Sequence, residues 1–471
     1  MNRSDLPFLS AAELADLIQR KDVSPVEATE AYLERIDSVD PKLTSYITVT
    51  RDLALAAARE AEAAIAQGGY LGPMHGVPVA VKDQFWTKGI RTTAGSSILA
   101  DFVPEEDATV MANLKAGGAV LLGKLNMSEY AMAEIFHHPH GTPRNPWDTS
   151  RNPGTSSSGS GAATAAFLCA TSLGEDTGGS IRTPANWSGI VGLRPSWGRV
   201  SRYGVFGGSW SMDQVGPMSR TVEDCAITLQ AIAGHDPKDP YTWDVPVPDY
   251  RRFLDGDVRR LKVGAVTERV RSDRLDPEYR DVIGKAIASL GDLGATVEEV
   301  SIPLMEMSGA VSMGIATAEW AAVHDRTFRV HLNELDHNNR IRYPTGRVLP
   351  AQAYYKAQKI RALLRRHMLD ALERFDVLVL PTGVGAAPPV ESVPGVPSKE
   401  QALAGLGARA SFTGPANLAG TPALSVPCGF TATNLPLGLQ IVGRPFDEAT
   451  VMKVAHAYEQ STDWHKRRPP V

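Results

Sequence analysis

The amino-acid sequence predicts an α/β fold, in which one large domain has a mixed β-sheet core flanked by helices. Helical patterns and short apolar runs alternate up to the C-terminus, which is typical of helices packed on a sheet. No linker, internal repeat or long run of charge divides the 471 residues. A composition of 43% hydrophobic and 21% charged residues is typical of a soluble globular protein. We therefore expect a single domain over residues 1–471.

Three parts are expected within this domain. Residues 1 to about 68 read as a helical N-terminal part, because two capping boxes open the chain. In these boxes Ser10 precedes Glu13 and Ser24 precedes Glu27, so that serine and glutamate side chains exchange hydrogen bonds with backbone N–H groups. About 69–225 is expected to be the core that carries the site, and about 226–471 a remainder with a substrate-pocket segment.

The elements follow from the spacing of apolar residues. Helices are expected over 53–66, 108–115, 161–170 and 351–375, the last with a strongly basic face. Buried strands are expected over 77–81, 119–122, 376–381, 423–427 and 437–442.

The segment 144–216 is dense in Gly, Ser, Thr, Asn and Pro. A structureless loop of that length is improbable inside a compact domain. We therefore expect this segment to form an active-site region whose turns need glycine.

Charge and composition exclude several classes of function. A net charge of −5 gives no electrostatic footprint for nucleic acid or for an anionic membrane. The first ten residues lack the apolar run of a secretory signal, and the longest small-apolar stretch, 161–173, is too short and too polar to span a bilayer. The three cysteines are few and far apart, as in a reducing compartment. We expect a cytoplasmic protein without a nucleic-acid or membrane partner.

Three histidines raise the question of a metal. His137, His138 and His140 lie close together, but Pro139 interrupts them and no Cys, Asp or Glu stands nearby at a familiar ligand spacing. Exposed loop histidines, or the rim of a substrate cleft, are the favoured interpretations. Neither a metal nor another cofactor is expected.

Two serine-rich segments and one lysine could carry chemistry. The segments 152–160 and 174–182 would each be read as turns if they stood alone. Their combination with Lys82, which ends an apolar strand and would be carried inward, favours a catalytic site.

With these three blocks the chain resembles the amidase signature family. The serine-rich block of the family stands at Gly154–Ser160, its Asp-Thr-Gly-Gly-Ser-Ile-Arg block at Asp176–Arg182, and its strand-borne lysine in Gly76–Asp83. The similarity extends to 123–127, 213–217 and 417–422. Thr155 and Ser158 depart from the family pattern, where glycines are usual.

The resemblance implies a triad for amide hydrolysis. Ser180 would be the nucleophile, Ser156 the relay and Lys82 the base, with the bridging serine following a cis peptide bond. The spacing of 24 residues known from the family selects Ser156 over Ser157 or Ser158. Burial disfavours a charged lysine and lowers its pKa, so a buried Lys82 could take a proton near neutrality.

The same resemblance implies supporting groups around the nucleophile. The N–H groups of Thr177, Gly178, Gly179 and Ser180 would form an oxyanion hole. Ser157 would help to orient Lys82.

Asp176 and Arg182 flank the nucleophile on either side. A structural ion pair that braces the loop is the favoured interpretation, and direct contact with substrate is the alternative.

Two functions follow from the resemblance. The first is a hydrolase that cleaves amide C–N bonds of small aryl or apolar amides, and also carbamates (urethanes) or esters, through an acyl-enzyme on Ser180. The alternative is the glutaminase-type subunit of a tRNA-dependent amidotransferase, which yields ammonia to a partner. A homodimer is left open, and a catalytically dead binding module is disfavoured because all three triad positions are filled.

An expected apolar cleft favours the first function. Such a cleft would reward aryl substrates more than glutamine. Its expected lining is Met305, Met307, Met313, Trp320, Phe136, His137 and His138.

Overall fold

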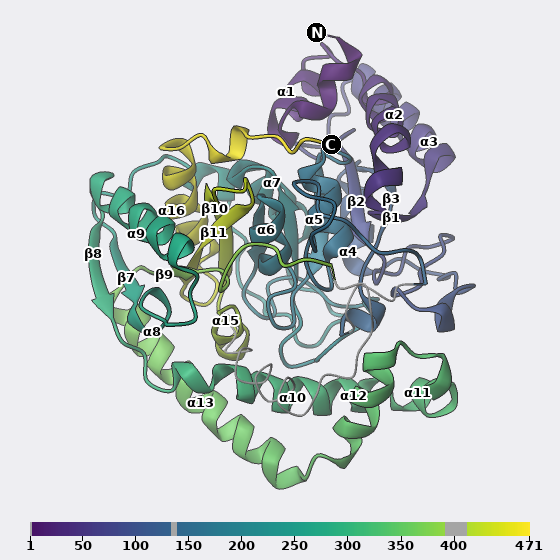
Figure 1. Cartoon of the computed structure of the whole chain (residues 1–471). Helices are drawn as coiled ribbons and strands as arrows, with labels where there is room; N and C mark the ends of the chain where they lie inside the picture. Colours follow the sequence, from purple (N-terminus) through teal and green to yellow (C-terminus); the bar gives the residue numbers. More distant parts are fainter. Residues whose placement is uncertain (1, 133–138, 391–411) are drawn as a thin grey trace.

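The computed structural model describes residues 2–132, 139–390 and 412–471 (Figure 1). Within these ranges eleven strands form one sheet in the order β1-β3-β2-β4-β6-β5-β10-β11-β9-β7-β8. The strands are β1 Tyr46–Val49, β2 Pro78–Lys82, β3 Val120–Leu125, β4 Thr171–Glu175, β5 Val191–Arg194, β6 Val215–Ser219, β7 Lys262–Val266, β8 Thr296–Val300, β9 Val377–Pro381, β10 Ala423–Phe430 and β11 Pro436–Gly443.

The sheet is mixed, as the sequence predicts. The strand β2 pairs in parallel with β3 and β4, and β7 pairs in parallel with β8 and β9. The pairs β1–β3, β4–β6, β5–β6, β5–β10, β10–β11 and β9–β11 are antiparallel. The carboxyl ends of β2 and β4 therefore lie at the same edge of the sheet.

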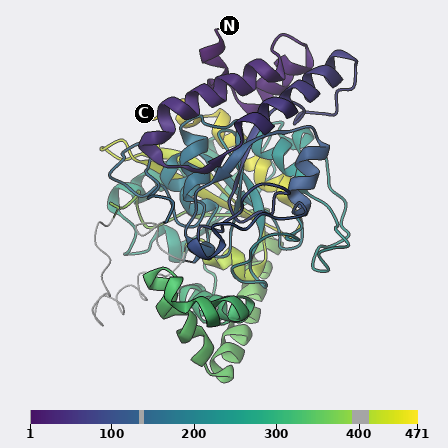
Figure 2. The same ribbon diagram turned by 90° about the vertical axis from the view of Figure 1, so that its right-hand side faces the viewer.

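Helices flank the sheet, which confirms the predicted fold class. The N-terminal helices and the group α10–α13 lie at opposite ends of the molecule in both views (Figures 1 and 2). The helices are α1 Ala11–Gln19, α2 Pro25–Leu43, α3 Arg51–Ala66, α4 Thr109–Ala116, α5 Ser158–Ala165, α6 Arg182–Ser188, α7 Val222–Ile232, α8 Thr267–Val270, α9 Pro277–Asp292, α10 Ser308–Val323, α11 Asp325–His331, α12 His337–Val348, α13 Ala351–Arg374, α15 Gly414–Ala419 and α16 Glu448–Gln460.

Local sequence signals account for several helix boundaries. Both capping boxes form, with the Glu13 N–H donating to Ser10 Oγ at 3.1 Å and the Glu27 N–H donating to Ser24 Oγ at 3.0 Å. The long basic helix α13 ends within one residue of the prediction. None of the helices in the described ranges combines the length and the apolar character that a membrane crossing needs.

One predicted helix is wrong in its position. The helix expected over 161–170 begins at Ser158 and ends at Ala165. It ends early because Phe167 takes a left-handed conformation, with φ 61°, and turns the chain into β4. The helix therefore starts inside the serine-rich block itself and holds that block against the sheet.

Candidate active site

The sheet brings the sequence-predicted residues to one edge. Lys82 is the last residue of β2, and Glu175 is the last residue of its parallel neighbour β4. Ser156 lies in the turn that leads into α5, and Ser180 lies in the turn between β4 and α6. Ligand sites of open α/β sheets commonly lie at the carboxyl ends of parallel strands.

Lys82 and Ser156 are in direct contact. Lys82 Nζ donates to Ser156 Oγ at 2.8 Å, and the two residues are 0% and 1% exposed. Burial lowers the pKa of Lys82 to about 8, against the opposing effect of the Glu175 carboxylate. A lysine with this pKa has a substantial neutral fraction at mildly alkaline pH, as a proton-accepting base requires.

A second buried lysine, Lys124, lies on the neighbouring strand β3 and has different partners. Its Nζ donates to the Phe85 carbonyl at 2.6 Å and to Thr92 Oγ1 at 2.8 Å, and lies 3.5 Å from Asp83. These contacts hold the loop after β2, and no serine is among the hydrogen-bond partners of this ammonium in the described chain.

Glu175 is a functional residue that the sequence reasoning missed. Its Oε2 lies 3.6 Å from Lys82 Nζ, and its Oε1 accepts a hydrogen bond from Thr177 Oγ1 at 2.9 Å. The signal was its place at the end of the strand that neighbours β2. Pairing between these strands could not be read from the chain, because 93 positions separate the two residues.

Asp176 organises the turn that carries Ser180. Its carboxylate forms a buried ion pair with Arg182 at 3.0 Å and accepts the Asn417 amide at 2.7 Å. It also accepts the N–H of Gly179 at 2.7 Å and that of Ile181 at 3.2 Å. The neighbouring guanidinium groups hold the pKa of Asp176 well below its usual range despite burial. Asp176 and Arg182 are thus placed as the brace that the first interpretation expected.

Ser180 itself lies at the surface of this arrangement. It is half-buried, and the preceding Gly178 is exposed. Among the described residues, the Ser180 hydroxyl makes no hydrogen bond, so the structure brings Lys82 and Ser156 together but does not join Ser180 to them. Hydrogen bonds of catalytic groups are often made only once substrate is bound.

The expected oxyanion hole needs a correction. The N–H of Gly179 already donates to Asp176 Oδ1, so it does not face an incoming oxyanion. Within the described chain, the N–H groups of Thr177, Gly178 and Ser180 have no hydrogen-bond acceptor. These three remain candidates for stabilising a developing negative charge.

Two further expectations differ from the structure. The Ser157 hydroxyl donates to the Glu175 carbonyl at 3.3 Å and does not contact Lys82, because the start of α5 turns it toward the end of β4. All peptide bonds in the described ranges are trans, including the one before Ser156, so the cis bond that the resemblance implies is not present.

The expected methionine-lined cleft is wrong. Met305 is buried in an apolar cluster with Met368 and Phe375, whereas Trp320 belongs to another cluster and donates to the Tyr130 carbonyl at 3.2 Å. Met307 is 40% exposed. These side chains pack the interior of the α10–α13 layer because helical apolar spacing does not distinguish a core face from a cleft wall.

Part of the histidine cluster lies outside the described residues, together with Phe136. Of the three histidines only His140 is described, and burial lowers its pKa. No group of three or more His, Cys, Asp or Glu in the described ranges is arranged to hold a metal ion.

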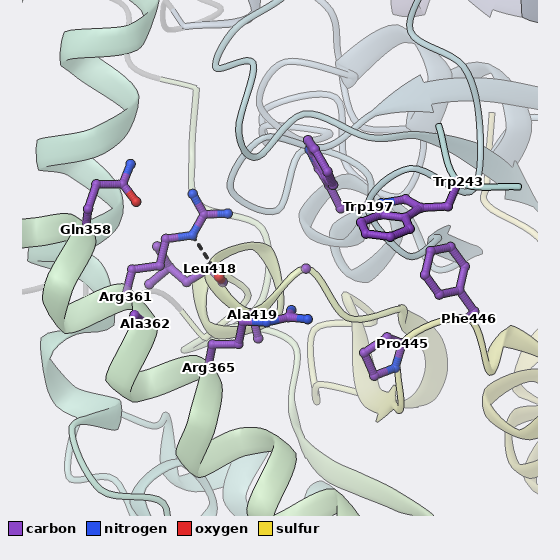
Figure 3. A pocket seen from close by; sticks show the side chains of 11 residues that line it. Trp197, Trp243, Gln358, Arg361, Ala362, Arg365, Leu418, Ala419, Pro445 and Phe446 are labelled. Atoms are coloured by element: carbon purple, nitrogen blue, oxygen red, sulfur yellow. Dashed lines mark hydrogen bonds between the residues drawn. The ribbon is translucent and has the colours of Figure 1, made fainter. Parts of the chain in front are cut away.

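A separate cavity of about 450 Å³ lies between α13 and the end of α15 (Figure 3). Aromatic side chains from two loops face Arg361 and Arg365 of α13 across it. Arg361 donates to the Leu418 carbonyl at 2.9 Å and to Ser211, so it ties α13 to α15. The cavity contains none of the triad residues. It adjoins the helix whose Asn417 holds Asp176.

Comparisons with known proteins agree with this geometry. The model of the family described as Amidase matches residues 27–452. A glutamyl-tRNA(Gln) amidotransferase subunit from Moorella thermoacetica is 44% identical over 489 residues, which cover 99% of each chain. Relatives with the same name from other bacteria are 38–44% identical.

Solved structures of free amidases share the fold. The native peptide amidase from Stenotrophomonas maltophilia has a TM-score of 0.84 at 32% identity and covers 98% of each chain. A bacterial aryl acylamidase of the amidase signature enzymes has a TM-score of 0.87 at 27% identity and covers 98% of each chain.

Proposed function

Because this chain belongs to the amidase family, whose members act on C–N bonds, we propose that it hydrolyses a carboxamide through an acyl-enzyme on Ser180. The observation that carries the proposal is the buried contact of 2.8 Å between Lys82 Nζ and Ser156 Oγ. A serine hydroxyl attacks an amide only if a base removes its proton. A buried lysine with a pKa of about 8 can act as that base.

The proposed reaction moves one proton along the triad. Neutral Lys82 takes the proton of the Ser156 hydroxyl, Ser156 takes that of Ser180, and Ser180 Oγ attacks the carboxamide carbon. The C–N bond then breaks, the proton returns along the same path to the leaving nitrogen, and an ester on Ser180 remains. Water attacks the ester carbon and releases the carboxylic acid. This path requires Ser180 Oγ to reach Ser156 when substrate binds.

Glutamine is the first candidate for the substrate. Relatives up to 44% identical over nearly the whole chain are named as one subunit of a glutamyl-tRNA(Gln) amidotransferase. In that role Ser180 would release ammonia from glutamine for a partner protein. The same names weigh against the expectation that neither another protein nor a nucleic acid takes part.

A free-standing amidase on apolar or aryl amides, carbamates or esters is the second candidate. It is supported by the solved peptide amidase and aryl acylamidase, which match over nearly their full lengths. It has lost the support of the methionine-lined cleft, whose expected residues pack the core.

A substrate panel tests the proposal. The purified chain is assayed alone with glutamine, primary amides, anilides, aryl carbamates and esters, and Ser180→Ala is run in parallel to subtract background. We expect ammonia release from glutamine with a kcat/KM above that for anilides. Anilide or carbamate cleavage that exceeds glutamine hydrolysis would assign the second candidate. No hydrolysis of any amide beyond the Ser180→Ala background would refute the proposed chemistry.

A further inference from the structure

Two buried carboxyl groups lie on either side of one hydroxyl group. Thr177 Oγ1 lies 2.9 Å from Oε1 of Glu175 and 2.7 Å from Oδ1 of Asp213. All three residues are at most 5% exposed. A hydroxyl group has one proton to donate, so Thr177 can donate to only one of the two carboxyl groups.

The other contact therefore needs a proton of its own. If both carboxyl groups were ionised, one pair of oxygens less than 3 Å apart would face each other with lone pairs alone. Such an arrangement is costly in a buried site, where charges are poorly screened. A proton on one carboxyl group supplies the missing donor, so the geometry requires that the two carboxyl groups hold one proton between them.

The surroundings indicate which carboxyl group holds this proton. Glu175 faces the Lys82 ammonium at 3.6 Å, which favours its ionised form. Asp213 accepts the N–H groups of Gly208 and Ser209, both at 2.7 Å, but no ion pair reaches it in the described chain. Burial and the Glu175 charge raise the pKa of Asp213 to about 8, which agrees with a proton on Asp213 near neutrality.

The pair is connected to the proposed base. Through Glu175 the contacts run from Asp213 and Thr177 to Lys82, and from Lys82 to Ser156. One negative charge beside Lys82 stabilises the ammonium that forms when the lysine takes a proton. Two negative charges would hold Lys82 in its protonated form and so prevent it from acting as a base.

We propose that Glu175 and Asp213 share one proton through the Thr177 hydroxyl and thereby set the proton occupancy of Lys82. Both are positioning residues that act through the lysine. The inference rests on the proposed function, because the proton on Lys82 matters to turnover only if the triad is used.

Other charged groups face this cluster and are compensated separately. Asp176 lies near Lys82 but is paired with Arg182 at 3.0 Å, with Arg194 at 3.9 Å. Arg202 faces Asp213 and is paired with Asp239 at 3.5 Å. All of these stay in place when Glu175, Thr177 or Asp213 is changed, so a shift of the Lys82 titration would report on the carboxyl pair.

The first test measures Lys82 directly and needs no turnover. Protein labelled with ¹³C at lysine Cε is titrated by NMR, and Lys82→Met assigns the signal. Wild type, Glu175→Gln, Asp213→Asn, Thr177→Val and Thr177→Ser are compared, with Glu106→Gln as an exposed control. We expect Glu175→Gln to lower the Lys82 midpoint by about one pH unit or more, since an opposite charge at this distance shifts a pKa by roughly 1–3 units.

The other variants separate a shared proton from a simple ion pair. Asp213→Asn is expected to lower the midpoint at alkaline pH, where the wild-type Asp213 ionises. Thr177→Val should move the midpoint by about half a unit or more, and Thr177→Ser, which keeps the hydroxyl, should restore the wild-type value. Midpoints for Asp213→Asn and Thr177→Val that coincide with wild type would overturn the proposal.

The second test follows the pH dependence of Ser180 modification by a sulfonyl fluoride in the same variants. Its midpoints should move in parallel with the NMR midpoints. Shifted NMR midpoints without any modification of Ser180 would refute the proposed function and leave the shared proton standing. Modification of Ser180 with unshifted midpoints would refute the shared proton alone.

Discussion

Lys82 Nζ donates to Ser156 Oγ at 2.8 Å, in a contact that joins the end of a buried strand to a serine 74 positions away. The strand fixes the lysine, and the turn before α5 fixes the serine, so neither side chain loses much freedom when the contact forms. Burial of the lysine then supplies a base whose pKa lies far below that of a lysine in water.

Removing the lysine should affect amides more than esters. We expect Lys82→Ala to reduce amide kcat/KM by about 10²–10⁴-fold, the range of general acid–base catalysis. Ester hydrolysis should fall less, because an alkoxide leaving group needs less proton donation than an amine. Parallel assays of a matched amide and ester measure the two losses, and near-wild-type amide turnover would exclude Lys82 as the base.

Activity should depend on pH through the same lysine. Only neutral Lys82 can accept a proton, and its pKa is lowered to about 8. The neutral fraction, and with it kcat/KM, should be constant well above that pKa and fall about tenfold per pH unit well below it. A pH–rate profile of the wild type checks this, and a flat profile from pH 9 to pH 6 would contradict it.

The two glycines before Ser180 should respond differently to alanine. A Cβ at Gly179 would lie 2.2 Å from Thr413 Oγ1, and the φ of 127° is one that residues with side chains rarely adopt. A Cβ at Gly178 would meet no atom within 4 Å. We expect Gly179→Ala to lower the unfolding free energy by about 1–3 kcal/mol and Gly178→Ala to leave it within about 0.5 kcal/mol. Chemical denaturation of both variants measures the difference, and equal stabilities would show that the turn relaxes.

Asp176 should be essential for folding as well as for the nucleophile turn. Asp176→Asn leaves the guanidinium of Arg182 buried without its carboxylate, and breaking a buried pair typically costs about 3–5 kcal/mol. The matched control is Asp37→Asn, whose pair with Arg51 is exposed and should cost at most about 1 kcal/mol. Denaturation curves of both variants compare these losses. A small loss for Asp176→Asn would show that Asn417 and Gln440 compensate for the charge.

Much of the architecture was predictable from local signals. The capping serines, the buried run that ends at Lys82 and the basic helix after Pro350 are each specified within a few residues of the chain. The serine-rich blocks and Lys82 were assigned from their resemblance to a family, and the structure places Lys82 beside Ser156.

The remainder depends on which strands become neighbours. Glu175 reaches Lys82 only because β4 pairs with β2, and Asp213 reaches Thr177 through a loop between β5 and β6. Met305 and Trp320 show the converse limit. Their apolar character was read correctly, but the face they occupy is decided by packing among α10–α13, which the sequence pattern does not specify.

The central claim is that Ser180 forms the acyl-enzyme with Lys82 as its base, and covalent labelling tests it most directly. The wild type, Ser180→Ala and Lys82→Ala are treated with an aryl sulfonyl fluoride at pH 8.5, roughly the pH at which neutral Lys82 predominates, and the modified residue is mapped by peptide mass spectrometry. We predict one adduct, on Ser180, in the wild type, none in Ser180→Ala, and labelling of Lys82→Ala that is slower by about 10²-fold or more. An adduct on another serine, or equal labelling rates with and without Lys82, would contradict the account.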